Sequence, residues 1–220
     1  MHVAIIGGGA AGFFAALSVK QHYPDARVVI FEKSSTCLRK VKISGGGRCN
    51  VTNACSSLKD FSKAYPRGEK LMRKALGMFD NFQLMAWFES RNVPLIIQDD
   101  RCVFPKSQKS QTIIDCFLTE ARKYHIVIEL NRGVQSISYL NNRIKFDFIN
   151  QKEPHQTYDK VVVTTGGSPQ KKGLNWLEVL GHKIETPVPS LFTFNMPDEP
   201  IRSLMGIVVE NTLVSISGTR

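Results

Sequence analysis

The segment VAIIGGGAAG at residues 3–12 combines a short apolar run with a glycine-rich turn. A continuous apolar run such as residues 3–6 is typical of a strand buried in a parallel sheet. Residues 10–21 are mostly apolar and stop before Tyr23-Pro24, which predicts a helix. The apolar segment RVVIF at residues 27–31 predicts a second strand. This order of strand, helix and strand predicts an α/β fold with a mainly parallel sheet.

The glycines of this turn match the pattern G-x-G-x-x-G at Gly7, Gly9 and Gly12. In that pattern the first glycine permits the tight turn, the second lets the backbone approach a pyrophosphate, and the third lets the helix pack against the strand. The helix that begins at Ala10 and Ala11 offers free N–H groups and the positive end of its dipole to phosphates. The turn therefore predicts a dinucleotide-binding site. The alternative is a glycine turn that holds no ligand.

An acidic residue, Glu32, lies twenty residues after Gly12, at the end of the predicted second strand. A carboxylate at this position accepts hydrogen bonds from ribose hydroxyls. It also repels a 2′-phosphate, because both groups are negatively charged. The spacing therefore favours FAD or NAD over NADP as the first nucleotide.

A second glycine-rich segment, KISGGGRCNVTN, occupies residues 42–53. Three consecutive glycines lose much conformational entropy on folding, which a folded loop tolerates where its backbone must approach another group closely. Arg48, Asn50 and Asn53 place polar side chains beside these glycines. Composition across residues 33–54 predicts a long loop rather than a core element. A flexible surface loop is the alternative, but a flavin nucleotide extends well past the first turn and would use this segment.

The basic side chains that follow Glu32 form one local cluster, with no acidic residue between them: Lys33, Arg39, Lys40, Lys42 and Arg48. A solvated loop and a loop that faces phosphates are both compatible with such a cluster, and the neighbouring motifs favour the second. A third segment, VVVTTGG at residues 161–167, predicts a buried strand whose Thr-Gly-Gly end passes close to the same nucleotide.

Further elements follow from periodicity, and Asn141-Asn142 is a candidate hairpin turn. Trp87 and Phe88, at helical spacing, are expected in the core. Helices are expected at residues 68–79, 82–92, 111–124 and 174–180, and strands at residues 125–130, 134–140, 143–150, 157–164, 182–185, 190–195 and 206–217.

Bulk composition excludes several classes of protein. The chain has 220 residues, of which 42% are hydrophobic and 22% charged, and its apolar runs are too short to span a membrane. Met1 leads directly into the first predicted strand without a basic or cleavable leader, so the cytoplasm is the default location. Five cysteines without a C-x-x-C pair argue against a disulfide framework and against a zinc site. The net charge of +10 fits a ligand that is anionic. Nucleic acid is not expected, because basic residues are not interleaved with aromatic ones.

Together these segments resemble the BaiN/RdsA-type (YhiN-like) family of NAD(P)/FAD-dependent oxidoreductases. The resemblance rests on five stretches and covers almost the whole chain: IIGGGAAG at residues 5–12, RKVKISGGGRCNVTN at 39–53, RCVFP at 101–105, TTGG at 164–167 and LGHKIETPVPSL at 180–191. It implies a Rossmann-like FAD-binding domain at residues 1–189, with a three-stranded antiparallel meander. Residues 190–220 would then begin an inserted β-rich domain, so the chain is expected to be a truncated member.

The resemblance also implies a function and a set of cofactor-binding residues. The expected activity is reduction of a small organic molecule, such as an enone-like compound, with NAD(P)H as the reductant; a non-catalytic FAD-binding remnant is the alternative. No catalytic residue and no metal is assigned. The expected FAD-binding residues are Gly7, Gly9, Ala10, Ala11, Gly12, Glu32, Lys33, Arg39, Lys40, Ser44, Gly45, Gly46, Gly47, Arg48, Cys49, Asn50, Val134, Thr165, Gly166 and Gly167.

Overall fold

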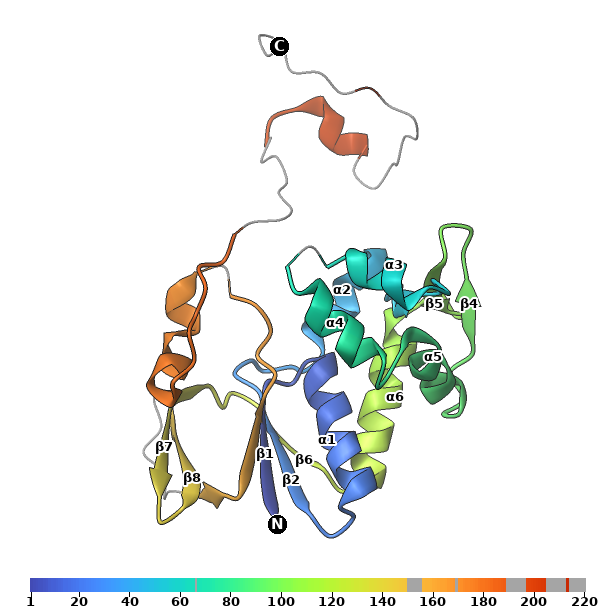
Figure 1. The fold of residues 1–220 in the computed structure, drawn as a ribbon. Coiled ribbons are helices and arrows are strands. Elements are labelled where there is room, and N and C mark those ends of the chain that lie inside the picture. The colour runs from blue at the N-terminus through green and yellow to red at the C-terminus, as the bar shows by residue number, and fades with distance from the viewer. Residues whose placement is uncertain (66, 150–155, 169, 189–196, 205–212, 214–220) are drawn as a thin grey trace.

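A parallel four-stranded sheet forms the centre of the molecule (Figure 1). The computed structural model describes every residue except 66, 150–155, 169, 189–196, 205–212 and 214–220. The strand order is β10-β1-β2-β6. The four strands are β1 (His2–Ile6), β2 (Arg27–Phe31), β6 (Val127–Glu129) and β10 (Lys160–Val163). The predicted α/β class is confirmed, and so are the first two strands.

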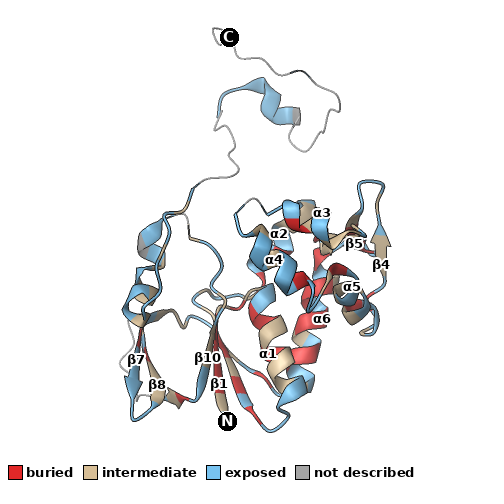
Figure 2. Cartoon of the chain, in the orientation of Figure 1, coloured by how far each residue is buried: buried red, intermediate tan, exposed pale blue. Residues whose placement is uncertain are grey.

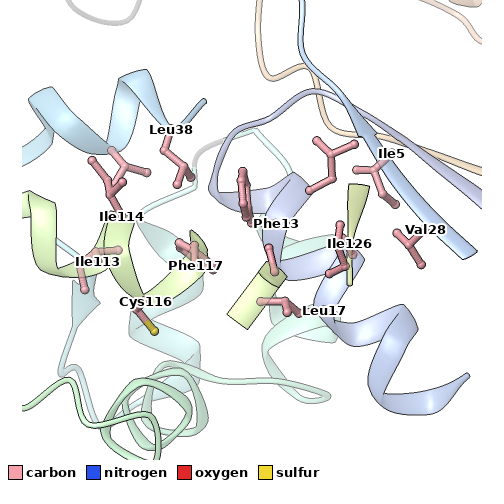
Figure 3. Close-up of a cluster of buried hydrophobic side chains, with 14 of the residues drawn as sticks. Ile5, Phe13, Leu17, Val28, Leu38, Ile113, Ile114, Cys116, Phe117 and Ile126 are labelled. Atoms are coloured by element: carbon pink, nitrogen blue, oxygen red, sulfur yellow. The ribbon is translucent and has the colours of Figure 1, made fainter. Parts of the chain in front are cut away.

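Two helices cover one face of this sheet: α1 (Ala10–His22) and α6 (Ser110–Lys123). Their apolar sides meet β1 and β2 in the larger core cluster, where Ile5, Phe13, Leu17 and Phe117 are buried (Figure 3). The rings of Phe13 and Phe117 lie 5.9 Å apart and join the two helices. Each such side chain contributes about 1.5–3 kcal/mol by leaving water, so this layer holds the sheet and the first turn rigidly.

An antiparallel meander covers the opposite face with β7 (Val134–Leu140), β8 (Arg143–Phe148) and β9 (Thr157–Tyr158). Phe31 of β2 lies at the centre of this second cluster, and its ring centroid is 5.9 Å from that of Phe146 and 5.8 Å from that of Tyr158. Asn141 and Asn142 have φ of 48° and 61°, which matches a hairpin turn. The predicted meander is confirmed.

The single strand predicted at residues 157–164 is two strands in the structure. β9 pairs antiparallel with β8, whereas β10 pairs parallel with β1. Asp159 lies between them and explains the division. Its N–H donates to the carbonyl of His2, its carboxylate accepts from the N–H of His2, and it pairs with Arg143 at 3.2 Å. The chain thereby passes from one sheet to the other without a loop.

The remaining helices and strands form a layer beside α1 and α6, around a small antiparallel sheet of order β3-β5-β4. These elements are α2 (Arg39–Ile43), the 3-10 turn η1 (Ser44–Gly47), β3 (Thr52–Asn53), α3 (Leu58–Lys63), α4 (Glu69–Leu76), α5 (Asn81–Glu89), β4 (Leu95–Ile97) and β5 (Cys102–Pro105). The helices expected at residues 68–79 and 82–92 correspond to α4 and α5. Phe88 is buried and Trp87 packs against the core, as predicted.

The prediction that residues 33–54 form a loop without core residues was wrong. Leu38, Val41 and Cys49 are buried in the larger cluster. The hydroxyl of Ser110 at the start of α6 donates to the carbonyl of Lys42 at 2.8 Å, which fixes α2 against α6. The sequence did not reveal α2, because a helix of five residues with one buried side chain is too short to show a periodic apolar pattern.

The C-terminal part of the described chain is largely exposed (Figure 2). It contains three 3-10 segments: η2 (Lys171–Gly173), η3 (Asn175–Leu180) and η4 (Pro200–Leu204). The strand expected at residues 182–185 does not form, since no neighbouring strand pairs with it and Pro187 follows. The strands expected at 190–195 and, apart from Leu213, at 206–217 fall on residues outside those that the structure describes. Within the described part, no helix has the length and apolar character needed to cross a membrane.

Candidate functional site

The carboxyl ends of β1 and β10 are joined at one edge of the sheet. The N–H of Thr164 donates to the carbonyl of Ile6 at 2.8 Å, and its hydroxyl lies 3.0 Å from the carbonyl oxygen of Gly7. Gly7 has φ of 114°, and a Cβ there would lie 2.6 Å from the carbonyl oxygen of Thr164. This edge is where open α/β sheets bind ligands, at the point where connections run in opposite directions.

The glycines of the first turn differ in what surrounds them. A Cβ on Gly12 would lie 1.9 Å from the carbonyl oxygen of Gly7, so helix and turn touch there. Gly9 has φ of −88°, and nothing lies within 4 Å of its hypothetical Cβ. Ala10 and Ala11, the first helical residues, are exposed. The backbone at Gly9 and the N-terminus of α1 therefore face open space, as a phosphate group requires.

Glu32 is held at the end of β2 by two backbone donors. The N–H groups of Gly8 and Ser34 each donate to its carboxylate at 2.8 Å. A carboxylate can accept about four hydrogen bonds, so these two contacts orient Glu32 and leave acceptor capacity. Cys37 lies beside it, and burial together with the charge of Glu32 raises the pKa of this thiol to about 11.

Backbone hydrogen bonds bring the segment before β7 to Glu32. The N–H of Glu32 donates to the carbonyl of Glu129 at 2.9 Å, and the N–H of Arg132 donates to the carbonyl of Glu32 at 2.8 Å. A Cβ on Gly133 would lie 3.4 Å from Cβ of Lys33. Lys33 and Val134 are therefore brought to the same side of the first turn as Glu32.

The second glycine segment has an unusual backbone. Gly45, Gly46 and Gly47 have φ of 55°, 66° and 85°, values that favour glycine. A Cβ on Gly45 would lie 2.7 Å from the backbone nitrogen of Asn50, whereas Gly46 faces open space. Successive backbone N–H groups in a turn can form a concavity that binds anions.

The residues that follow these glycines anchor the segment. The guanidinium of Arg48 donates to the carbonyl of Gly45 at 3.2 Å and to Gln108 at 3.3 Å, and it lies 4.2 Å from the ring centroid of Phe104. Cys49 is buried, which raises the pKa of its thiol, although a hydrogen bond with Ser44 lowers it. Arg48 thus positions the loop, a role that its charge alone did not reveal.

Contacts join the first turn, α2 and the end of β10 at this edge. The N–H of Leu38, at the start of α2, donates to the carbonyl of Gly8 at 2.8 Å. On α2, Nζ of Lys40 lies 3.4 Å from the hypothetical Cβ of Gly166, while Arg39 is exposed. Thr165, Gly166 and Gly167 are also exposed, and nothing lies within 4 Å of a Cβ built on Gly167. Open backbone at Gly9, Gly46 and Gly167 is the geometry expected of a nucleotide cradle.

Two cavities lie beside this edge, and sequence reasoning identified neither. One, of about 470 Å³, lies between the meander, β10 and η3. The other, of about 400 Å³, adjoins Asn50 and lies among β3, α3, α4 and α5. It includes Asn81, which the prediction placed outside the helix. The capping box in which Asp80 and Gln83 bond reciprocally was the available signal for this residue. The described residues include no His, Cys, Asp or Glu group suited to a metal ion.

Comparisons with known proteins agree with this architecture. The chain is 23% identical over 222 residues to a 3-dehydro-bile acid delta(4,6)-reductase of Clostridium scindens, covering 98% of this chain and 53% of that protein. It is 26% identical over 223 residues to a ribosomal RNA dihydrouridine synthase of Haemophilus influenzae, covering 97% of this chain and 54% of that protein. The chain therefore spans about half the length of the curated relatives it matches.

Solved structures share the fold at lower identity. A 3-ketosteroid-delta4-(5alpha)-dehydrogenase of Rhodococcus jostii superposes with a TM-score of 0.57 at 15% identity, covering 80% of this chain and 47% of that one. Quinol fumarate reductase FrdA of E. coli superposes with a TM-score of 0.56 at 16% identity, covering 77% of this chain and 33% of that one. The family resemblance drawn from the motifs is confirmed: the profile of the HI0933-like protein Rossmann domain matches residues 1–213, and the chain belongs to that family.

Proposed function

We propose that this chain is the FAD-binding part of an oxidoreductase that reduces a carbon–carbon double bond conjugated to a carbonyl, with NAD(P)H as the reductant. One observation carries the proposal. The Gly7–Gly12 turn, Glu32 and Thr164–Gly167 meet at one edge of the sheet although they are distant in sequence, and α2, which leads into the Gly45–Gly47 segment, is bound to the same edge through Leu38 and Lys40. We further propose that residues 1–189 form this FAD-binding unit and that residues 190–220 begin a second one.

We propose that the residues of this edge contact FAD along its length. The ribose hydroxyls would reach the oriented carboxylate of Glu32, and Lys33 and Val134 would lie towards the adenine. The pyrophosphate would meet the N–H groups at Gly9, Ala10 and Ala11, with Arg39 and Lys40 supplying positive charge. The ring end would lie along the second glycine segment and the last strand, whose proposed contacts are Ser44, Gly45, Gly46, Gly47, Cys49, Asn50, Thr165, Gly166 and Gly167, with Arg48 as their support.

The reaction class is supported by the names of the relatives. Both the bile acid reductase and the dihydrouridine synthase are named for saturating a double bond in a ring. In each ring that double bond is conjugated to a carbonyl, which makes it an acceptor of hydride. Bound FAD would supply the hydride transfer, and the protein would orient the ring and exclude water.

The two relatives are named for substrates of very different size, a bile acid and a ribosomal RNA. The sequence predicted a small-molecule substrate and no nucleic-acid partner. The relatives named for ribosomal RNA weigh against the expectation that nucleic acid is not a partner. The net charge of +10 suits a polyanion as well as FAD. We propose a conjugated ring as the shared substrate feature.

The test is a titration of the purified 220-residue chain with FAD, followed by flavin absorbance and tryptophan fluorescence. Saturable binding is expected, and Glu32→Ala should weaken it about tenfold or more, because hydrogen bonds to a charged acceptor are strong. Glu89→Ala, at an exposed site outside the edge, is the matched control. A chain that never retains FAD would refute the proposal.

The second part of the test adds NADH or NADPH to the FAD complex without oxygen. Bleaching of the flavin absorbance is expected from an enzyme. A complex that binds FAD and is never bleached by either nicotinamide would identify the alternative, a non-catalytic FAD-binding protein.

A further inference from the structure

The cavity of about 400 Å³ next to Asn50 is bounded by β3, α3, α4 and α5. It starts where the second glycine segment ends, since Asn50 and Asn53 belong to its wall. Its size lies in the range of small-molecule sites. Its lining is Asn50, Val51, Thr52, Asn53, Phe61, Tyr65, Leu76, Phe79, Asp80, Asn81 and Leu84.

Asn81 is the polar residue of this wall that the fold leaves incompletely paired. Its side chain is only 2% exposed, and its Nδ2 donates to the carbonyls of Asn53 at 2.7 Å and Cys55 at 3.0 Å. Its Oδ1 is buried and has no hydrogen-bond partner in the structure. Buried acceptors without partners are rare because desolvation is then uncompensated. A donor supplied by a ligand would satisfy this oxygen.

Aromatic side chains supply the apolar part of the wall. Tyr65 and Phe79 are each 38% exposed, and the ring of Phe61 lies 6.3 Å from that of Tyr65 at 75°. Such rings stack on flat ligands. Three other polar side chains of the wall have structural partners: Asp80 caps α5 through the N–H of Gln83, Asn50 donates to Sγ of Cys102, and Asn53 donates to the carbonyl of Asp100.

The cavity of about 470 Å³ between the meander, β10 and η3 offers no comparable unpaired polar atom in its described lining. Its lining combines apolar side chains such as Ile137 and Leu177 with His182 and Lys183. None of these described side chains has a buried polar atom without a partner. The cavity beside Asn50 therefore carries the stronger indication of a ligand.

We propose that the cavity beside Asn50 binds a flat conjugated ring that carries an N–H or O–H donor, with Oδ1 of Asn81 as the acceptor and Tyr65 and Phe79 as stacking partners. This rests on the proposed function, because the ring would be the substrate of the FAD site next to it. Asn81 is a substrate-binding residue in this proposal and transfers no proton.

The experiment uses the ¹⁵N-labelled 220-residue chain, with and without saturating FAD, and three probes: uridine, N3-methyluridine and 4-androstene-3,17-dione. All three contain a double bond conjugated to a carbonyl, but uridine alone carries a ring N–H donor. Uridine is expected to shift the side-chain amide signal of Asn81. N3-methyluridine and the steroid should bind about tenfold more weakly, as loss of one hydrogen bond predicts.

Two tyrosine variants locate the ring. Tyr65→Ala should weaken uridine about tenfold, whereas Tyr139→Ala, in the wall of the other cavity, should leave it unchanged. Equal affinity for uridine and N3-methyluridine, shifts confined to the Tyr139 cavity, or no binding of any probe would each overturn the proposal. Flavin absorbance in the same samples reports FAD binding independently, so a failure of the FAD proposal is distinguished from a failure of this one.

Discussion

The two glycine-rich segments of this protein need glycine for different reasons. In the Gly7–Gly12 turn, Gly7 and Gly12 are surrounded by backbone, and a Cβ on either would collide with a carbonyl oxygen at 2.6 or 1.9 Å. In the Gly45–Gly47 segment, Gly46 and Gly47 have room for a side chain but adopt left-handed φ values. Packing around Gly7 and Gly12 closes the first segment, whereas in the second segment Gly46 and Gly47, unlike the packed Gly45, need glycine for their backbone conformation.

Replacing a glycine should therefore reduce folding stability where the glycine is closely packed, and ligand binding where its backbone is open. A closed segment loses folding stability when a glycine is replaced, since neighbouring backbone must move. An open segment loses mainly the conformation that presents its N–H groups. Gly9 combines both surroundings, because it lies in the closed segment and faces open space.

The largest effect is expected for Gly12→Ala. The new methyl would meet the carbonyl oxygen of Gly7, and the clash should outweigh the gain of about 1 kcal/mol in helix propensity. We expect the free energy of unfolding to fall by about 3 kcal/mol, which lowers Tm by about 10 °C for a chain of this size. Thermal unfolding followed by circular dichroism measures it. A Tm equal to that of the parent would mean that helix and turn are not in close contact.

An alanine at Gly9 should affect FAD binding without affecting thermal stability. Gly9 has an ordinary φ of −88° and free space at its Cβ position. Gly9→Ala should therefore keep Tm within a few degrees, while FAD affinity falls about tenfold or more because the methyl occupies the path of the pyrophosphate. Fluorescence titration with FAD measures the affinity. An unchanged Kd would place the pyrophosphate elsewhere.

Backbone conformation is tested in the open segment by Gly46→Ala and Gly46→Asn. Alanine at φ of 66° costs about 1–2 kcal/mol, whereas asparagine tolerates this region better. We expect urea denaturation to rank the parent first, then the Asn variant, then the Ala variant. Identical stability of all three chains would show that Gly46 is free to leave the left-handed region.

Much of the fold was predictable from the sequence because the decisive signals are local. The apolar run from Val3 to Ile6, the glycine turn and the pattern of α6 each identify an element directly. The division at Asp159 was not predictable, since its hydrogen bonds to His2 join residues at opposite ends of the domain. The burial of Val41 was missed for a similar reason, because it depends on packing against α6.

The candidate site was predicted less completely than the fold. Its glycines and Glu32 follow a known spacing, and the structure brings those segments together. The support of the loop by Arg48 through Gln108 and Phe104 was hidden, because it joins residues about sixty positions apart. The unpaired oxygen of Asn81 was hidden as well, since only the three-dimensional arrangement shows which polar atoms lack partners.

A smaller effect is expected for the charge that α2 adds to the site. Both lysines of α2 are exposed, but Nζ of Lys40 lies near Gly166, whereas Lys42 is near the other end of the helix, where its carbonyl binds Ser110. Lys40→Ala should weaken FAD about threefold and reduce the salt dependence of binding, as removal of one charge near a phosphate predicts. Lys42→Ala is the matched control. Equal losses for both variants would indicate a diffuse effect of net charge.

The smallest effect is expected at two thiols, one beside Glu32 and one just after the second glycine segment. Burial and then the charge of Glu32 raise the pKa of Cys37 to about 11, whereas burial alone raises that of Cys49. A nearby carboxylate disfavours the thiolate, so Glu32→Gln should lower the pKa of Cys37 while burial keeps it above its ordinary value. Alkylation by iodoacetamide, read by mass spectrometry from pH 8 to 11, should then be faster at Cys37 and unchanged at Cys49. Equal acceleration at both thiols would mean that the substitution had opened the whole edge, and that the two segments do not respond independently.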